Sequence, residues 1–178
     1  FVNRTESIRN KNGNQYLSFM KKLSFFTVAL LFSTGGGGVY AQGTFVHPGL
    51  LHSQNDIDQI KERLAANDTE TLKAFEVLKN SWVANKGVND IWGVTEYIKR
   101  GIAGRKLYMN AYRNAAKAYQ CALLWKITGE TQWAERAVYV LNQYVAITKG
   151  IGGNTNQSLV PGFIGYQFLN AGELMRDY

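Results

Sequence analysis

The sequence contains a single cysteine, Cys121, among its 178 residues. One thiol cannot form an intrachain disulfide, so the fold must be held together by its hydrophobic core. Cys121 lies among Ala118, Ala122 and Trp125. These neighbours favour a small buried side chain over a reactive nucleophile.

The sequence also lacks the familiar catalytic and cofactor motifs. It has no G-x-S-x-G, no H-E-x-x-H, no paired cysteines and no phosphate-binding loop behind a strand. The segments "GIAG" and "GIGGN" lie between expected helices, so we interpret them as loops and not as dinucleotide fingerprints. His52 and Asp56 are four positions apart, but two ligands do not make a metal site. We therefore expect no metal and no cofactor. No carboxylate pair of the kind used by sugar hydrolases stands out.

Long hydrophobic runs are missing as well. The longest, Leu23–Phe32, is about half the length that a bilayer-spanning helix needs. It follows Met20 and two lysines and leads into small residues ending at Ala41, which is the order of a secretory signal peptide. We predict residues 20–41 to be this peptide, with a short buried helix as the alternative. We also predict a periplasmic or secreted product without a stable membrane anchor.

Residues 1–19 open without methionine, are polar and have no apolar period. We interpret them as a segment upstream of the natural start at Met20, with an extended native N-terminus as the alternative. The remaining residues, 42–178, are enough for one domain or for part of a larger one.

The formal net charge of +7 is concentrated near the N-terminus. Residues 1–41 hold five basic residues and one acidic residue, so residues 42–178 keep an excess of +3. The later basic residues alternate with acidic ones along expected helix faces, which is typical of a solvated surface. We therefore expect no nucleic acid partner. A mild positive charge suits a polyanionic ligand outside the cytoplasm.

Two helices are expected before residue 85. Ser53 followed by Asp56 is a helix N-cap pattern, and the apolar spacing continues to Asn67. The second helix follows at once, and scattered glycines then indicate a long connection up to residue 104. The expected buried faces are Ile57, Ile60 and Leu64 in the first helix, and Leu72, Phe75, Leu78 and Trp82 in the second.

Residues 107–148 carry the strongest pattern in the chain. Two apolar stripes at helical spacing flank the turn Thr128–Thr131, which predicts an antiparallel helical hairpin. Trp125 and Trp133 are expected in the hairpin core, with sugar stacking as the alternative. The stripe of the first helix is Tyr112, Ala115, Ala116, Tyr119, Ala122 and Leu123, and that of the second helix is Trp133, Ala137, Val138, Leu141, Tyr144 and Val145.

A further helix is expected from about Pro161, after an irregular loop. No segment alternates with period two for long enough to predict a sheet. The expected class is therefore all-α, built of successive helical hairpins.

Three blocks of this sequence resemble the alginate lyase family of secreted bacterial polysaccharide lyases. They are "AYQCALLWKITGETQWAERAVYVLNQY", then "GGN", then "GFIGYQFLNAGELMRDY", preceded by a similar lead-in, "FVHPGLLHSQNDIDQIKERL". The resemblance covers residues 44–178. It implies that residues 42–178 form the front part of an incomplete (α/α) toroid, a ring of helical hairpins around a groove for an anionic polysaccharide.

The same resemblance implies cleavage of uronic acid polymers by β-elimination. In that reaction a base removes the proton beside the sugar's own carboxylate, which must first be neutralised by donors. The family's catalytic Asn, His, Tyr and Arg lie in helices beyond the position of Tyr178. The catalytic residues are therefore unknown, and we expect this chain by itself to lack lyase activity.

Five residues are expected to line the groove: Arg100, Asn110, Asn154, Tyr166 and Gln167. Arg100 would pair with a uronate carboxylate or be an ordinary solvated arginine. Asn110 would bond sugar hydroxyls or cap a helix. Tyr166, with Gln167 beside it, would meet a sugar ring or belong to the core. Asn154 would contribute to the groove or serve a turn.

Two other function classes fit the paired helices. One is a helical-repeat binding module of the TPR-like kind, and the other is an (α/α) glycoside hydrolase.

Overall fold

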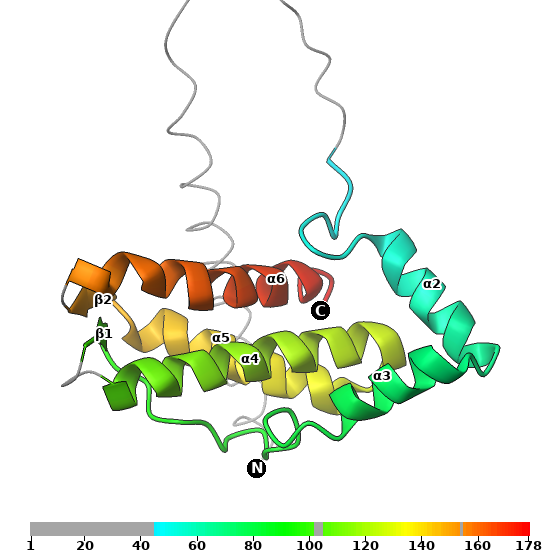
Figure 1. Ribbon diagram of the computed structural model, residues 1–178, viewed down its shortest axis with the longest axis horizontal. Coiled ribbons are helices and arrows are strands. Elements are labelled where there is room, and N and C mark those ends of the chain that lie inside the picture. The colour runs from blue at the N-terminus through cyan, green and yellow to red at the C-terminus, as the bar shows by residue number, and fades with distance from the viewer. Residues whose placement is uncertain (1–44, 102–104, 154) are drawn as a thin grey trace, which may run out of the picture. The chain divides into compact units, whose positions relative to one another are not determined.

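The computed structural model describes residues 45–101, 105–153 and 155–178 (Figure 1). The predicted upstream segment and signal peptide lie outside the described residues. Contacts divide the chain into two units, of which Phe45–Tyr178 holds everything described below. This unit is mostly helical, which confirms the all-α class at the coarse level. No helix in the described ranges is long and apolar enough to cross a membrane.

The first helix among the described residues, α2, spans Gln54–Ala65 and begins as the sequence predicts. The Ser53 hydroxyl accepts from the Asp56 backbone N–H at 3.2 Å, and the Asp56 carboxylate accepts from the Ser53 backbone N–H at 2.7 Å. A cap of this kind contributes about 1 kcal/mol to helix stability. Ile57, on the inner face, is fully buried.

Helix α3 spans Thr69–Lys79. The predicted apolar face of this helix included Trp82, which is beyond its C-terminal end. The helix ends at its C-cap, Asn80, whose side chain donates to Glu76. Trp82 therefore lies beyond the helix and is 64% exposed, so its expected place on a buried face was wrong.

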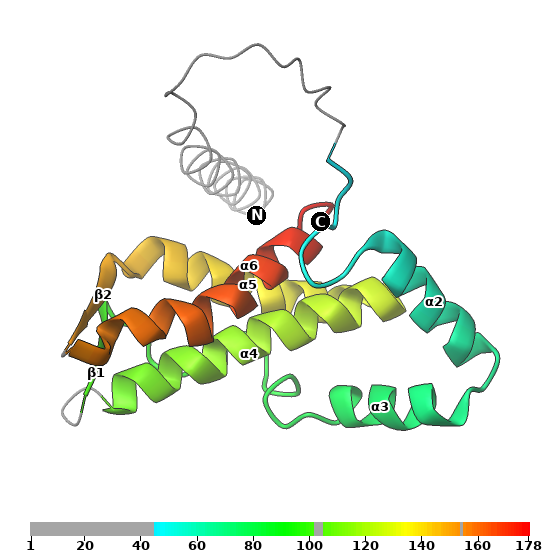
Figure 2. The same ribbon diagram turned by 45° about the horizontal axis from the view of Figure 1, so that its top comes forward.

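Helices α4 (Arg105–Thr128) and α5 (Thr131–Ile147) form the predicted antiparallel hairpin. Gly129 makes the turn with φ +74°, a conformation that glycine adopts without strain. The two helices pack against each other, with α5 beside α4 in Figure 1 and partly hidden behind α6 in Figure 2. Small side chains allow this close approach: Ala111, Ala115, Ala118 and Ala122 on α4, and Ala134 and Ala137 on α5, are buried.

The buried face of α4 is rotated from the predicted stripe. Tyr112 is 41% exposed, whereas the polar Asn114 and Lys117 are fully buried. The reason is the segment between α3 and the first strand, whose backbone these two side chains bind. At the far end of the hairpin Trp133 is buried, as expected. Trp125 is half-buried against Tyr178, with the rings edge to face.

Two short strands were not expected. β1 (Tyr97–Arg100) pairs in parallel with β2 (Gly150–Gly153), and the helical hairpin is the crossover between them. Thus "GIGG" is a strand and not a loop. A Cβ on Gly150 would lie 3.6 Å from the Tyr97 ring, which is an ordinary van der Waals contact.

The chain then passes through a 3₁₀ turn, Thr155–Ser158, and a π-helical turn, Pro161–Gly165, into α6, Tyr166–Leu174. A helical segment from Pro161 was expected, and its first turn is wider than an α-helix. Figure 2 shows α6 lying along α4. Ala171, Leu174 and Met175 are buried at its end.

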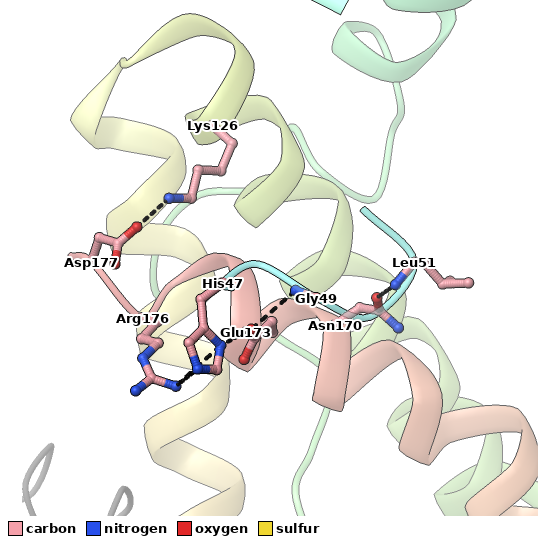
Figure 3. Close-up of polar contacts among 8 residues, drawn as sticks. All are labelled: His47, Gly49, Leu51, Lys126, Asn170, Glu173, Arg176 and Asp177. Atoms are coloured by element: carbon pink, nitrogen blue, oxygen red, sulfur yellow. Dashed lines mark hydrogen bonds and ion pairs between the residues drawn. The ribbon is translucent and has the colours of Figure 1, made fainter. Parts of the chain in front are cut away.

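The lead-in before α2 is tied to the end of α6 (Figure 3). Glu173 accepts hydrogen bonds from the His47 ring and, at 3.2 Å, from the Gly49 backbone N–H. The Leu51 N–H donates to Asn170 at 3.0 Å. Arg176 donates to the other His47 ring nitrogen at 2.7 Å. The first and last described segments are thus joined by side chain contacts.

Candidate functional site

The candidate site is centred on Arg100, the last residue of β1. Its guanidinium carbon lies 5.5 Å from the centre of the Tyr108 ring and 5.7 Å from that of Phe163. The Nη1 atom is buried and has no hydrogen-bond partner among the described residues. Buried donors in folded proteins are nearly always paired. Arg100 as a whole is half-buried, so an oxyanion that reaches Nη1 after a small movement of the exposed Phe163 ring would satisfy this donor.

Three elements bring these side chains together. Arg100 comes from β1, Tyr108 from the first turns of α4, and Phe163 from the π-helical turn. Parallel pairing with β2 fixes the backbone of Arg100 opposite Gly153. Phe163 is 44% exposed, so one aromatic wall of the site is open to solvent. An aromatic ring beside a guanidinium can contact a sugar ring and its carboxylate together.

No family model, curated protein or solved structure matches the chain.

Asn110 contacts the segment around Gly93. It is half-buried within α4, and its Nδ2 atom would lie 3.8 Å from a Cβ on Gly93. It faces the segment that follows α3. Since α4 begins at Arg105, Asn110 is not a helix cap.

The predicted pair at the start of α6 divides between surface and interior. Tyr166 is 47% exposed and follows Phe163 by three positions. Gln167 is buried, and its side chain nitrogen donates to the Phe163 carbonyl at 2.8 Å. Its amide nitrogen is thus used within the helical segment. Asn154 lies outside the described residues.

A second polar pair joins the start of α2 to α4. The Nε2 atom of His52 lies 2.5 Å from the Tyr119 hydroxyl, although the two residues are 67 positions apart. Burial lowers the pKa of His52, and the nearby Asp56 only partly opposes this. Burial, with a smaller contribution from Tyr166, raises the pKa of Tyr119. His52 is therefore neutral at neutral pH, and its Nε2 atom shares a hydrogen bond with the protonated Tyr119 hydroxyl, in a direction set by the imidazole tautomer.

Sequence reasoning did not find the aromatic partners of Arg100 or the partner of His52. All of these contacts join separate elements, so no local pattern could reveal them. The described residues also contain no group of three or more His, Cys, Asp or Glu placed to hold a metal ion.

Proposed function

We propose that this protein is a periplasmic or secreted polysaccharide lyase that cleaves a uronic acid polymer, alginate or a similar one, by β-elimination. The observation that carries the proposal is Arg100, with its buried, unpaired guanidinium nitrogen between two aromatic rings. Such a group would bind a sugar carboxylate and shield it from water.

The chemistry supports this assignment. A uronate polymer carries a carboxylate on each sugar, so a groove that holds several sugars requires cations away from the cleavage point. Arg100 has no acidic partner among the described residues, and an added carboxylate would satisfy its donor. We assign it to binding. The base and acid would come from residues that the resemblance puts beyond Tyr178.

The fold supports the proposal only at the level of how the helices are arranged. The hairpin of α4 and α5, with α6 packed along α4, is the kind of helical layer from which an incomplete (α/α) toroid is built. The parallel strands that bracket the hairpin weigh against a plain TPR-like array, whose units are helix pairs alone. A glycoside hydrolase would require a pair of catalytic carboxylates. Arg100 is a cation, so it does not favour the hydrolase alternative.

The test uses this chain and any longer natural protein that contains it. Each is mixed with alginate or another uronate polymer, and the ultraviolet absorbance of the unsaturated product is followed. We expect product from the longer protein and none from the 178-residue chain alone. Binding of the chain to each polymer is measured by affinity electrophoresis. A longer protein that cleaves no uronate polymer would refute the proposal.

Arg100→Ala in the longer protein should raise KM and leave kcat nearly unchanged, because a distant subsite binds ground and transition states equally. The expected loss is about 1 to 3 kcal/mol. Lys99→Ala is the matched control, since Lys99 is exposed on the opposite face of β1. An equal fall in kcat would put Arg100 at the reacting sugar instead.

A further inference from the structure

The segment between α3 and β1 presents a pair of tryptophans on the surface. The rings of Trp82 and Trp92 meet edge to face, with centres 5.6 Å apart and planes at 89°. Trp82 is the more exposed of the two. A tryptophan outside any helix, held against a second one and open to solvent, offers a flat apolar face of the kind that stacks on a sugar ring.

Two cations border this pair. The Arg113 guanidinium carbon lies 6.0 Å from the Trp82 ring centre and 5.7 Å from that of Trp92. The Lys86 ammonium lies 5.1 Å from the Trp92 ring centre and is paired with Asp90 at 2.6 Å. Arg113, in contrast, has no carboxylate partner among the described residues. Its charge is therefore available to an anionic ligand.

The segment is held rigidly by fully buried side chains of α4. Asn114 accepts from the Trp92 backbone N–H at 3.1 Å and donates to the Trp92 carbonyl at 2.8 Å. Lys117 donates to the carbonyls of Gly87 and Asp90, at 2.7 and 2.9 Å. The backbone around Trp92 is thus fixed before any ligand arrives, which reduces the entropy lost on binding.

Positive charge gathers around the same segment. Arg136 donates to the Ala84 carbonyl at 3.1 Å, on the side nearer α5. Burial is the main cause that lowers the pKa of Lys117; Cys121 and Asp90 oppose it, and the charges of Arg136 and Lys86 add a smaller decrease. Lys117 and Arg136 are thus engaged with backbone carbonyls and Lys86 with Asp90, which leaves Arg113 as the cation of this group without an acidic or carbonyl partner among the described residues.

We propose that Trp82, Trp92 and Arg113 form a second binding site, for a uronate residue of an acidic polysaccharide, separate from the Arg100 site. The sugar stacks on the exposed Trp82 indole, and its carboxylate pairs with Arg113. The inference rests on the proposed function, because it takes the same class of polymer as ligand.

The helix geometry keeps the two sites apart and gives Asn110 a role. Arg113 follows Tyr108 by five positions, about 140° around an α-helix, so the sites use different faces of α4. Asn110 precedes Arg113 by three positions and shares its face. It lies beside Gly93, next to Trp92, where its amide can bond a sugar hydroxyl.

The experiment measures binding of the 178-residue chain by calorimetry. The probes are an oligouronate prepared from alginate and a neutral glucose oligosaccharide of matched length. The variants are Trp82→Ala, Trp82→Phe, Arg113→Gln and Arg100→Ala. The matched control is Lys73→Gln, which removes one exposed positive charge from α3. Circular dichroism first checks that each variant is folded as the wild type is.

We expect Trp82→Ala and Arg113→Gln each to weaken oligouronate binding about tenfold or more, the effect of losing one charged hydrogen bond or one good stacking contact. Trp82→Phe should recover part of the loss, and Lys73→Gln should bind as the wild type does. The neutral oligosaccharide should bind more weakly, with no dependence on Arg113.

Three results would overturn the inference. If Arg100→Ala weakens binding and the Trp82 and Arg113 variants do not, the second site fails while the proposed function stands. If the neutral probe binds as well as the oligouronate, the acidic class of ligand is wrong. If the wild type binds no oligouronate, this inference fails, while the proposed function is decided separately by the cleavage assay on the longer protein.

Discussion

Gly153 lies opposite Arg100 in the parallel strand pair, so close that a Cβ on Gly153 would come within 2.2 Å of the Arg100 carbonyl oxygen. Its φ of +127° is also one that other residues rarely adopt. The position of Arg100 in the strand pair therefore requires glycine, which has no side chain, at position 153.

Gly153→Ala should separate the strands and displace Arg100. We expect a loss of about 1 to 3 kcal/mol in the free energy of unfolding, measured with urea, from backbone strain and lost pairing. Oligouronate binding should weaken as well. Gly162→Ala is the control, because a Cβ there meets nothing within 4 Å. Equal stability of the two variants would contradict the close approach.

The His52–Tyr119 pair predicts a dependence of stability on pH. The pKa of His52 is lowered in the folded chain from 6.5, chiefly by burial, so the unfolded chain binds the proton more readily. The contribution of neutral His52 to the free energy of unfolding is fully present above pH 6.5. It is lost as the pH falls from 6.5 through the pKa that His52 has in the folded chain.

Urea unfolding between pH 8 and pH 5 should show this loss in the wild type, and His52→Gln should lack that part of it. The nuclear magnetic resonance titration of the His52 ring should have its midpoint below 6.5. A midpoint above that value would mean that Asp56 outweighs burial.

Cys121 should be unreactive in the native protein. It is fully buried, its thiol donates to the Ala84 carbonyl at 3.6 Å, and burial raises its pKa to about 12. Little thiolate therefore exists at pH 8. An aromatic disulfide reagent should react at the rate of unfolding, and urea should accelerate it. Immediate reaction without urea would show the thiol to be accessible.

Glu173→Ala should release the lead-in from α6. This carboxylate accepts from both His47 and the Gly49 backbone, so its loss removes two of the bonds in Figure 3. Hydrogen exchange of the Gly49 and Leu51 amides should accelerate. Asp177→Asn is the control, because Asp177 pairs with Lys126 outside the lead-in. Similar exchange rates in the two variants would show that Glu173 does not hold the segment.

Local patterns in the sequence predicted local structure well. The cap at Ser53 and the turn at Gly129 depend on residues a few positions apart, and both are present. The buried face of α4 was predicted less well. Asn114 and Lys117 are polar, so their hydropathy predicts exposed side chains, but both are buried. Their polar groups are satisfied by backbone from a distant segment, which no periodicity can show.

The strands and the aromatic side of the candidate site were missed for the same reason. β1 and β2 are four residues each and pair across the whole helical hairpin. Arg100 was predicted to pair with a uronate carboxylate, but its contacts with Tyr108 and Phe163 join three separate elements and leave no local pattern in the sequence. Asn110 lies beside Gly93, and its predicted place in the same groove as Arg100 stays a prediction.

The parallel pairing of Tyr97 with Gly150 means that the chain enters and leaves the helical hairpin at neighbouring points, about 4.8 Å apart across two paired strands. The hairpin is thus an insertion between two adjacent, paired strands. Its far turn at Gly129 can accept extra residues without moving either strand, which makes that turn a natural position for grafting a peptide or a reporter domain.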